Sequence, residues 1–526
     1  MLPLDVVIMA AGKGTRMKSK TPKVLHTLGG RALLGHVMQA AVALSARKIV
    51  IITGHEAELV QKGASQMFAQ EFSRQEGGVE KSTHENPTLT PTLTPTLTPQ
   101  LQFALQMPQL GTGHAIQQAL PHLSDDGLTL VLSGDVPLTK IKTLQGLIES
   151  SLEASHSEKS SSSKQAKSSN IVHSSNIPTD AALTLLTLNT TNPFAYGRVL
   201  RDLASPHKVL AIVEEKDATP EQKRITEIYT GVLVAPTKHL RNWVNGLDNK
   251  NAQGEYYLTD VVKAAVRSGV PIKTLSIDDP IEVMGVNSPA QLAELERAFQ
   301  LSNAQVLMEQ GVRIKDPNRI DVRGELICSE DVEIDINSVF SGRVVLGRGV
   351  HIGPNCVISN AVIQDNAVIE AYTHIEGSGS QKAVVVGTNA RVGPFARLRP
   401  GALLGSDVHV GNFVEIKNST LENGAKANHL AYVGDSHLGE RVNFGAGAIT
   451  ANYDGANKHK TVIENDVHVG SNSVLVAPVT LGAGGTIGAG STITKSTEPG
   501  ALSITRAKQL SVQGWSRPVK SETKSS

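Results

Sequence analysis

Up to about residue 289, short aliphatic runs alternate with stretches whose apolar positions recur at helical spacing. Such alternation is typical of βαβ units, so we expect an α/β domain with a mostly parallel sheet covered by helices. Strands are predicted at residues 6–9, 49–53, 128–133, 182–188 and 231–235.

Two segments interrupt this pattern. Residues 87–99 repeat Thr-Leu-Thr-Pro, and residues 150–169 contain ten serines. Regularly spaced prolines block strand pairing, and densely polar segments cannot build a core. We therefore predict mobile insertions near 75–101 and 150–178.

A helix start follows at Ser288, with Pro289 at the first helical position and Gln291 three residues after the capping serine. The apolar pattern predicts a helix that runs to the stop signal Gly311. Its expected apolar side comprises Leu292, Leu295, Phe299, Val306 and Leu307. We interpret residues 288–311 as a helical linker between a first domain, 1–287, and a second domain, 312–526.

Beyond this helix the hydrophobic period changes to six residues. This period fits neither a helix nor alternating hairpins, but it is typical of a solenoid of short parallel strands. The aliphatic series are Leu346, Ile352 and Ile358; Ile363, Ile369 and Ile375; Val386, Val392, Leu398, Leu404, Val410 and Ile416; and Ile463, Val469, Leu475, Leu481, Ile487 and Ile493. The register breaks near 376–385, 418–432 and 450–460, where we expect loops that leave the solenoid and carry functional residues.

Charge and cysteine content narrow the possible functions. Lys and Arg total 50 against 49 Asp and Glu, so no overall charge attracts nucleic acid or an anionic membrane. No apolar stretch reaches the roughly 18 residues of a membrane span. Two cysteines, Cys328 and Cys356, cannot form a disulfide framework, and the N-terminus resembles a first strand more than a signal peptide. We therefore expect a cytoplasmic protein.

The loop after the first predicted strand is a candidate anion site. Residues 10–17 read Ala-Ala-Gly-Lys-Gly-Thr-Arg-Met. Gly12 and Gly14 allow N–H groups to approach a phosphate chain, while Lys13 and Arg16 add positive charge. The spacing matches neither a P-loop nor the dinucleotide fingerprint, and an ordinary turn between strand and helix remains the alternative.

Three further motifs support a nucleotide site. Lys23 supplies another cation, and Gln106 with the turn 111–114 offers an amide able to read a base edge. Asp135 comes directly after a hydrophobic strand, at the carboxyl end where open α/β sheets bind ligands. Beside phosphates, one Asp can anchor Mg²⁺, although a turn-capping role is the alternative.

The second domain has its own candidate site. Arg399 and Lys417 are able to bind a phosphate, and His429 is able to remove a proton near neutral pH. Donors from the loop at 452–453 are placed to stabilise an oxyanion. A structural histidine is the alternative for His429.

These motifs carry a resemblance to a known family. Residues 10–17 followed by Pro22-Lys23 resemble the signature of sugar-1-phosphate nucleotidyltransferases. Together with Tyr196-Gly197-Arg198, Gly254-Glu255-Tyr256-Tyr257 and Gly285-Val286-Asn287, the chain outside the insertions resembles the bifunctional N-acetylglucosamine-1-phosphate uridyltransferase/glucosamine-1-phosphate acetyltransferases. The resemblance implies a Rossmann-like nucleotidyltransferase domain followed by a left-handed parallel β-helix of hexapeptide repeats, with a C-terminal arm.

For the first domain the resemblance implies transfer of UMP from UTP to N-acetylglucosamine-1-phosphate, with Arg16 and Lys23 catalytic and Mg²⁺ on Asp135 and Asn287. The implied nucleotide-binding residues are Met9, Ala10, Ala11, Gly12, Lys23, Gln106, Gly111, Thr112, Ser133, Gly134 and Asp135. The implied sugar contacts are Gly197, Glu214, Tyr229 and Asn287.

For the second domain the resemblance implies acetylation of glucosamine-1-phosphate by acetyl-CoA, with His429 as the base, in a homotrimer. The implied sugar-phosphate contacts are Arg399, Lys417, Tyr432 and Asn443. The implied acetyl-CoA contacts are Ala446, Asn452, Tyr453, Ser471, Ala489 and Arg506.

Two positions depart from the family pattern, which usually has Tyr in place of Ser133 and Asn in place of Tyr229. The second change removes a sugar-binding amide, so the affinity or selectivity for the sugar is open. Two other readings also remain at this point: a nucleotidyltransferase with a purely structural or regulatory β-helix, and a non-enzymatic scaffold with vestigial sites.

Overall fold

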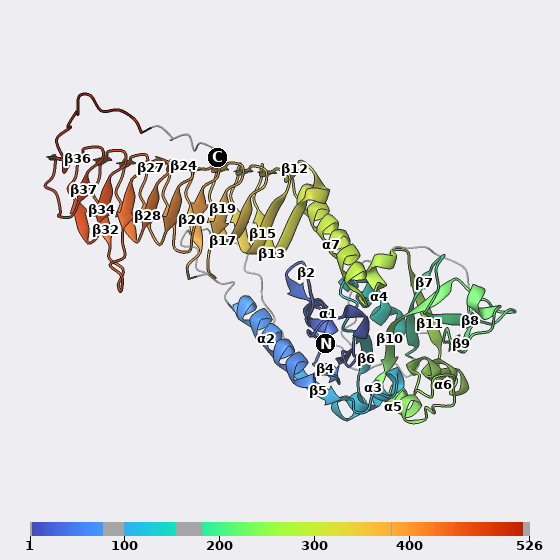
Figure 1. The fold of residues 1–526 in the computed structure, drawn as a ribbon. Helices are drawn as coiled ribbons and strands as arrows, with labels where there is room; N and C mark the ends of the chain where they lie inside the picture. The colour runs from blue at the N-terminus through green and yellow to red at the C-terminus, as the bar shows by residue number, and fades with distance from the viewer. Residues whose placement is uncertain (1–2, 77–98, 154–180, 380, 519–526) are drawn as a thin grey trace, which may run out of the picture. The chain divides into compact units, whose positions relative to one another are not determined.

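The computed structural model describes residues 3–76, 99–153, 181–379 and 381–518, in two units, Met1–Phe299 and Gln300–Ser526 (Figure 1). Most of both predicted insertions falls on 77–98 and 154–180, outside the described residues, so their character stays a prediction.

A mixed sheet forms the centre of the first unit, with strand order β11-β7-β10-β6-β1-β4-β5 and with β8 and β9 attached to β10. The strands are β1 Leu4–Met9, β4 Lys48–Thr53, β5 Gln100–Leu105, β6 Leu128–Ser133, β7 Leu183–Asn189, β8 Gly197–Arg201, β9 Val209–Val213, β10 Glu227–Pro236 and β11 Ile272–Ile277. A separate pair consists of β2 Thr27–Leu28 and β3 Arg31–Ala32. All five predicted strands are confirmed, with ends that differ by a few residues.

Helices cover both faces of this sheet, over two clusters of buried aliphatic side chains. One face carries α1 Leu33–Ala43, α2 Ala57–Glu76 and α4 Ile141–Leu152; the other carries α3 Thr112–Ala119, α5 Thr237–Asn245 and α6 Val261–Arg267. Short 3₁₀ helices are η1 Thr15–Met17, η2 Lys23–Leu25, η3 Leu120–His122, η4 Gln222–Arg224, η5 Leu258–Asp260, η6 Pro280–Val283 and η7 Pro317–Arg319.

The direction of β10 differs from the expected βαβ pattern. Strands β1, β4, β5 and β6 pair in parallel, but β10 runs antiparallel to β6 and β7. The antiparallel β8–β9 hairpin precedes β10 and reverses the chain. Strands β1 and β6 end at register partners, Met9 and Ser133, so their following loops leave the sheet at the same edge.

Helix α7, Pro289–Glu309, begins as the sequence predicts. The Gln291 backbone N–H donates to the Ser288 hydroxyl at 3.3 Å, and the Gln291 side-chain oxygen accepts from the Asn287 backbone N–H at 2.9 Å. The division between the two units falls inside this helix, between Phe299 and Gln300. The prediction for Val306 is wrong: its side chain is 49% exposed.

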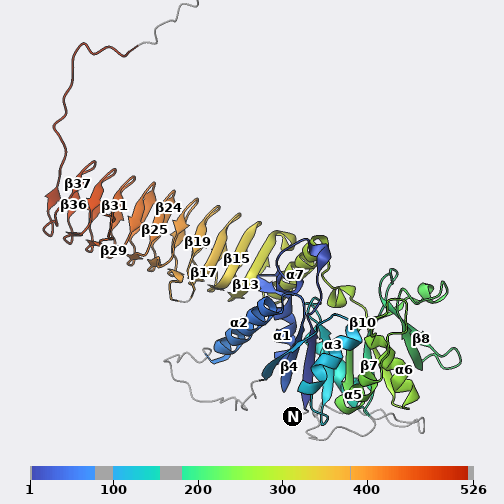
Figure 2. The ribbon, with the colours of Figure 1, turned by 60° about the horizontal axis from the view of Figure 1, so that its bottom comes forward.

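The second unit is a parallel β-helix with three faces, each a stack of short strands (Figure 2). The first face is β12 Arg313–Ile314, β14 Glu333–Ile334, β16 His351–Ile352, β18 Val368–Ile369, β21 Arg391–Val392, β24 His409–Asn412, β27 Lys426–His429, β30 Asn443–Phe444, β33 His468–Val469, β36 Thr486–Ile487 and β38 Leu502–Ser503.

The other two faces start from longer strands that they share, β13 Ile320–Cys328, β15 Ser338–Leu346 and β17 Val357–Ile363. The second face continues with β19 His374–Glu376, β22 Arg397–Leu398, β25 Glu415–Lys417, β28 Tyr432–Gly434, β31 Ile449–Ala451, β34 Val474–Val476 and β37 Thr492–Ile493. The third continues with β20 Val384–Val386, β23 Leu403–Leu404, β26 Thr420–Leu421, β29 Ser436–Leu438, β32 Thr461–Ile463 and β35 Val479–Leu481.

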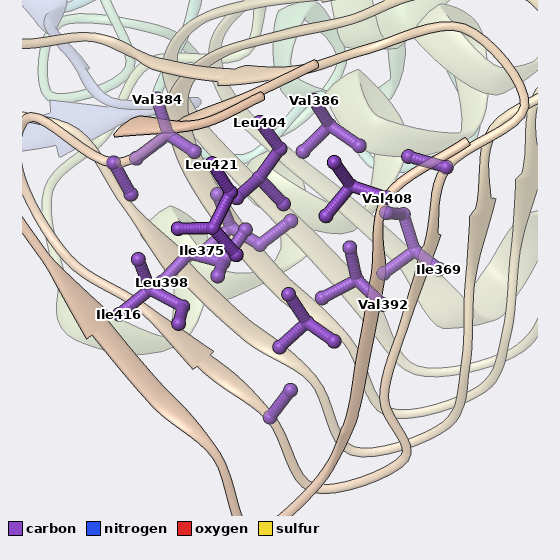
Figure 3. Packing of buried hydrophobic residues seen from close by; sticks show 14 of the residues in the cluster. Ile369, Ile375, Val384, Val386, Val392, Leu398, Leu404, Val408, Ile416 and Leu421 are labelled. Atoms are coloured by element: carbon purple, nitrogen blue, oxygen red, sulfur yellow. The ribbon is translucent and has the colours of Figure 1, made fainter. Parts of the chain in front are cut away.

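The core of the β-helix consists of the aliphatic columns that the period of six predicts. Every residue of the four series is buried, and Figure 3 shows part of the stack around Ile369, Leu398 and Ile416. The loop predicted at 418–432 is wrong. This segment forms a regular coil through β26 and β27, with Leu421 and the small Ala427 pointing inward, because one step of five residues replaces a step of six.

Candidate functional site

The loop after β1 lies at the carboxyl edge of the first sheet. The Ala10 backbone N–H donates to Ile52 O at 2.9 Å, and the Gly134 backbone N–H donates to Met9 O at 2.9 Å. Gly14 has φ +58°, and a Cβ there would lie 2.8 Å from Lys23 Cβ, so glycine permits both the turn and the close approach of Lys23. Arg16 lies exposed on η1.

Lys23, Asp135 and Asn287 come together beside this loop. The Lys23 ammonium contacts the Asp135 carboxylate and donates to Asn287 Oδ1 at 3.1 Å. The Val286 backbone N–H donates to Asp135 O at 2.9 Å, which ties the segment of Asn287 to the end of β6. One carboxylate oxygen and one amide oxygen thus face a single cation, a donor set that suits Mg²⁺ when phosphates and water complete its coordination.

The turn after β5 joins the same edge. The buried Gln106 side chain donates to Gly111 O at 2.9 Å, and the Thr112 hydroxyl accepts from the Leu258 backbone N–H at 3.1 Å. Gln109, which the sequence analysis missed, donates from its side chain to Ala11 O. The structure therefore brings the segments 9–12 and 106–112 together, as a nucleotide site requires.

The predicted sugar residues meet around β8 and β10. Tyr229 and Gly197 are register partners, and a Cβ at Gly197 would lie 3.8 Å from the Glu214 carboxyl carbon. Burial raises the pKa of Glu214, while the Thr259 hydroxyl, which donates to it at 2.9 Å, acts in the opposite direction. Burial also raises the pKa of Tyr196, and the Asp135 charge acts in the same direction to a smaller extent.

Tyr229 has an unusual environment. Its side chain is buried, and burial raises the pKa of its phenol, with the nearby Glu214 carboxylate acting in the same direction. Within the part of the chain that the structure describes, its hydroxyl finds no hydrogen-bond partner. Leaving a buried hydroxyl unpaired costs about 1–3 kcal/mol, so the free protein carries this penalty at Tyr229.

In the second unit, predicted residues that lie 17 to 25 positions apart stack at one corner of the β-helix. Backbone N–H groups link successive coils: Gly447 donates to His429 O at 3.1 Å, Asn472 to Ala446 O at 2.8 Å and Gly490 to Ser471 O at 2.8 Å. His429, Ala446, Ser471 and Ala489 thus follow one another along this column. Arg506 lies at its end, with its Cδ 3.7 Å from the position of a Cβ on Gly490.

A cation cluster lies on the next face. Arg399 Nη1 donates to Glu415 Oε1 at 2.7 Å, and Lys417 Nζ lies 3.8 Å from Asp435 Oδ2. The neighbouring Lys458 ammonium lowers the pKa of Lys417, and burial acts in the same direction, against the Asp435 carboxylate. Two lysines held together in this way favour an anion between them.

The loop at 452–460 forms one wall of this cluster, as predicted. Asn452 donates from its side chain to Asp435, and the exposed Tyr453 hydroxyl donates to Gly455 O at 2.6 Å. The backbone N–H groups of Asn457 and Ala456 and the His459 ring hold the pKa of Asp454 well below its usual range, which fixes the turn.

Tyr432 and Asn443 lie on different faces. Tyr432 begins β28, next to the Arg399 cluster. The pKa of Arg399 is raised mainly by its hydrogen bond to Glu415 and to a smaller extent by Tyr432. Asn443 begins β30, one coil beyond β27 on the face of His429. Glu415, Asp435 and Lys458 were not predicted as site residues, because the period of six does not show which outward side chains meet.

Within residues 3–76, 99–153, 181–379 and 381–518, no three His, Cys, Asp or Glu side chains come together in a way that could hold a metal. None of the helices in this part of the chain combines the length and apolar character needed to cross a lipid bilayer.

Two protein families match different parts of the chain, one in each unit. Residues 6–165 match a family described as MobA-like NTP transferase domain, and residues 460–495 match the bacterial transferase hexapeptide family, six repeats. "Bifunctional protein GlmU" of Albidiferax ferrireducens is 55% identical over 98% of this chain and 100% of its own length. The protein of the same name from Polaromonas sp. is 56% identical over 98% of each chain, and that of Azoarcus sp. is 48% identical over 98% and 100%.

The chain belongs to the GlmU family. Full-length identity at this level confirms the resemblance drawn from the motifs. As a GlmU relative the chain is a bifunctional transferase, with a Rossmann-like nucleotidyltransferase domain and a left-handed parallel β-helix of hexapeptide repeats. The family assignment also favours two enzymatic activities over a purely structural β-helix. GlmU nucleotidyltransferases act on small molecules and generally need a divalent metal.

Proposed function

We propose that the two activities of this bifunctional enzyme reside in two separate sites, one in each unit. The enzyme acetylates glucosamine-1-phosphate with acetyl-CoA, and then transfers UMP from UTP to N-acetylglucosamine-1-phosphate, giving UDP-N-acetylglucosamine and pyrophosphate. The convergence of Lys23, Asp135 and Asn287 beside the 10–17 loop supports the second reaction. The stacked column of His429, Ala446, Ser471 and Ala489 supports the first.

In the first unit, the sugar phosphate attacks the α-phosphorus of UTP in line, and pyrophosphate leaves. UTP lies against segments 9–12 and 106–112, with Ser133 and Gly134 contributing through their backbone. Lys23 and the exposed Arg16 offset the negative charge that develops on the phosphates. Gly197, Glu214, Tyr229 and Asn287 hold the sugar.

We assign Mg²⁺ to this site, on Asp135 and Asn287, whose oxygens both face the Lys23 ammonium. Bound to these two oxygens, the ion would supply positive charge that offsets the charge of the nucleotide phosphates.

In the second unit, Arg399 and Lys417 bind the phosphate of glucosamine-1-phosphate, aided by Tyr432 and Asn443. His429 removes the proton of the amine as it attacks the thioester carbonyl, and the loop at 452–453 stabilises the oxyanion. Acetyl-CoA lies along the corner column, through Ala446, Asn452, Tyr453, Ser471 and Ala489. Arg506 at its end faces the phosphates of CoA.

We further assign a homotrimer. Next to the His429 corner, Tyr372, Phe395 and Phe413 form an exposed ladder with ring centroids 4.9 and 5.4 Å apart, and Leu430 continues it. Exposed aromatic side chains in a row are typical of interface cores, and two further copies of the chain are the occupants that we assign.

We place the enzyme in the cytoplasm. Both cysteines are free, and burial raises the pKa of Cys328 to about 12 and that of Cys356 to about 11. Two cysteines that form no disulfide in a chain of this length are typical of a reducing compartment.

One experiment tests the function as a whole. Pure protein is incubated with glucosamine-1-phosphate, acetyl-CoA, UTP and Mg²⁺, with each left out in turn, and the products are identified by mass. We expect UDP-N-acetylglucosamine only from the complete mixture, and N-acetylglucosamine-1-phosphate when UTP is omitted. A sugar nucleotide formed without acetyl-CoA at the full rate contradicts the proposed order. Sedimentation of the same preparation reports the number of subunits.

Tyr229→Phe tests the unpaired hydroxyl. If this group binds the sugar, the variant loses a hydrogen bond worth about 1 kcal/mol, so KM for N-acetylglucosamine-1-phosphate rises about fivefold. The free protein becomes more stable, because the buried hydroxyl without a partner is gone. The two measurements are pyrophosphate release against sugar concentration and urea denaturation.

The acetyltransferase activity of Tyr229→Phe is the internal control, and its KM values stay unchanged. A variant with unaltered KM and higher stability shows that Tyr229 fills space without touching the sugar.

A further inference from the structure

The side chains of Asn412 and His429 meet across neighbouring coils. Asn412 ends β24 and His429 ends β27, and the two are register partners on one face of the β-helix. Asn412 Oδ1 lies 2.9 Å from His429 Nδ1. The Leu430 backbone N–H donates to Asn412 O at 3.1 Å, so the main chain fixes the same coil-to-coil contact beside the ring.

This contact selects one tautomer of the imidazole. A neutral histidine has one ring nitrogen that donates and one that accepts, and an amide oxygen only accepts. Opposite Asn412 Oδ1, His429 Nδ1 must therefore carry the proton, which leaves the lone pair of Nε2 free. The other tautomer turns an Nδ1 lone pair against an oxygen and places the proton on Nε2, where it cannot act as a base.

The fold gives no backbone reason for an asparagine at position 412. At other corners of the β-helix the asparagine itself takes the left-handed conformation, as Asn355 (φ 59°), Asn389 (φ 57°) and Asn418 (φ 45°) do. At this corner Phe413 takes it, with φ 57°. The side chain of Asn412 therefore has a function other than turning the chain.

We propose that Asn412 is a positioning residue for acetyl transfer, which holds His429 in the tautomer whose Nε2 accepts the proton of the sugar amine. The proposal rests on the proposed role of His429. The amine nitrogen forms a bond to the thioester carbonyl carbon, and the carbon–sulfur bond breaks. The amine proton moves to His429 Nε2 and then to the thiolate of CoA, while the Nδ1 proton stays on the bond to Asn412.

The charged and titratable groups near this pair include His409 on β24, Arg391 on β21, Lys426 on β27 and Glu370 after β18, and Asn443 on β30 is neutral. Burial lowers the pKa of His409, and the charges of Arg391, Lys426 and His429 act in the same direction, against that of Glu370. Among the residues that the structure describes, the group opposite His429 Nδ1 is the Asn412 amide oxygen and not a carboxylate.

Asn412→Ala is the first test. General base catalysis contributes about 100- to 10,000-fold, and without the amide His429 reaches the competent tautomer and orientation only part of the time. We expect kcat for CoA release to fall on the order of 10- to 100-fold, with KM for both substrates within about twofold of the wild type. Pyrophosphate release stays unchanged.

Asn412→Asp tests the positioning role through the pH dependence of kcat/KM. A purely structural role for Asn412 predicts no change in that pH dependence. A carboxylate opposite Nδ1 stabilises the imidazolium, so the base is neutral only at higher pH. The acid limb of the kcat/KM profile for acetyl transfer therefore shifts upward by about one pH unit, and activity above that limb exceeds that of Asn412→Ala.

Asn355→Asp is the matched control, because Asn355 Oδ1 also accepts a hydrogen bond across coils, from Asn337 Nδ2 at 2.9 Å. It should alter neither kcat nor the pH profile.

Two outcomes refute the positioning role. One is that Asn412→Ala keeps kcat within twofold; the other is that both Asn412 variants lose activity equally, with lower melting temperatures and no pH shift. If His429→Ala remains active, the base assignment itself fails, which is a different result from the failure of Asn412 alone.

Discussion

His429→Ala abolishes release of CoA from acetyl-CoA and leaves pyrophosphate release intact. The variant removes the group that we assign as general base, so the attacking amine loses the acceptor for the proton that it must give up as the amide forms. General base catalysis contributes about 100- to 10,000-fold, so we expect a loss of that size in kcat. A thiol reagent measures the first reaction, and coupled pyrophosphate detection measures the second.

The matched control is His437→Ala, which removes an imidazole from β29 on another face of the β-helix. This variant should retain both activities, because His437 makes only a weak 4.0 Å contact with Glu422. Since His429 is exposed at the end of β27, its loss should leave the melting temperature nearly unchanged. Loss of both activities in a folded His429→Ala protein contradicts the two-site proposal.

Asp135→Ala has the opposite effect: pyrophosphate release falls, and acetyl transfer persists. The substitution removes the carboxylate that contacts Lys23 and that we assign to Mg²⁺. Loss of one preorganised electrostatic group typically costs about 100- to 1000-fold in kcat, and we expect at least that. The Mg²⁺ concentration for half-maximal activity should also rise, which a role limited to capping the turn does not predict.

Asp126→Ala controls for the loss of an acid in the same region. Asp126 precedes β6, whereas Asp135 follows it, so the two lie at opposite ends of one strand. Its side chain is 68% exposed and pairs with Arg47, and an exposed ion pair contributes at most about 1 kcal/mol. This variant should keep both activities and its Mg²⁺ dependence. An Asp135→Ala protein with normal Mg²⁺ dependence counts against the metal assignment.

Local patterns in the sequence were sufficient for much of the architecture. Aliphatic runs located the strands that end at Met9 and Ser133, and a period of six located the inner columns around Ile369 and Leu398. The Ser288 cap also formed as predicted. These features depend on residues close in sequence, whose spacing decides which side chains point inward.

The direction of β10 and the regular coil at 418–432 were decided by the tertiary structure. Strand β10 is antiparallel because the β8–β9 hairpin precedes it, and pairing partners cannot be read from strand composition. At 418–432 the hydrophobic period only shortens by one residue and continues with small side chains such as Ala427, which a search for large aliphatic residues overlooks.

The sequence by itself determined the order of the two domains, the aliphatic core and the residue types able to bind phosphates. Each of these features depends on a short motif or on the hydrophobic period of six. Only the tertiary structure brought the Gln109 side chain to the Ala11 carbonyl oxygen. It also decided which outward side chains of the β-helix meet: Lys417 with Lys458, and Asn412 with His429. The physical reason is register. A coil of the β-helix can use five or six residues per side, so partners on successive coils lie at variable sequence distances, and only the backbone hydrogen bonds between coils fix them.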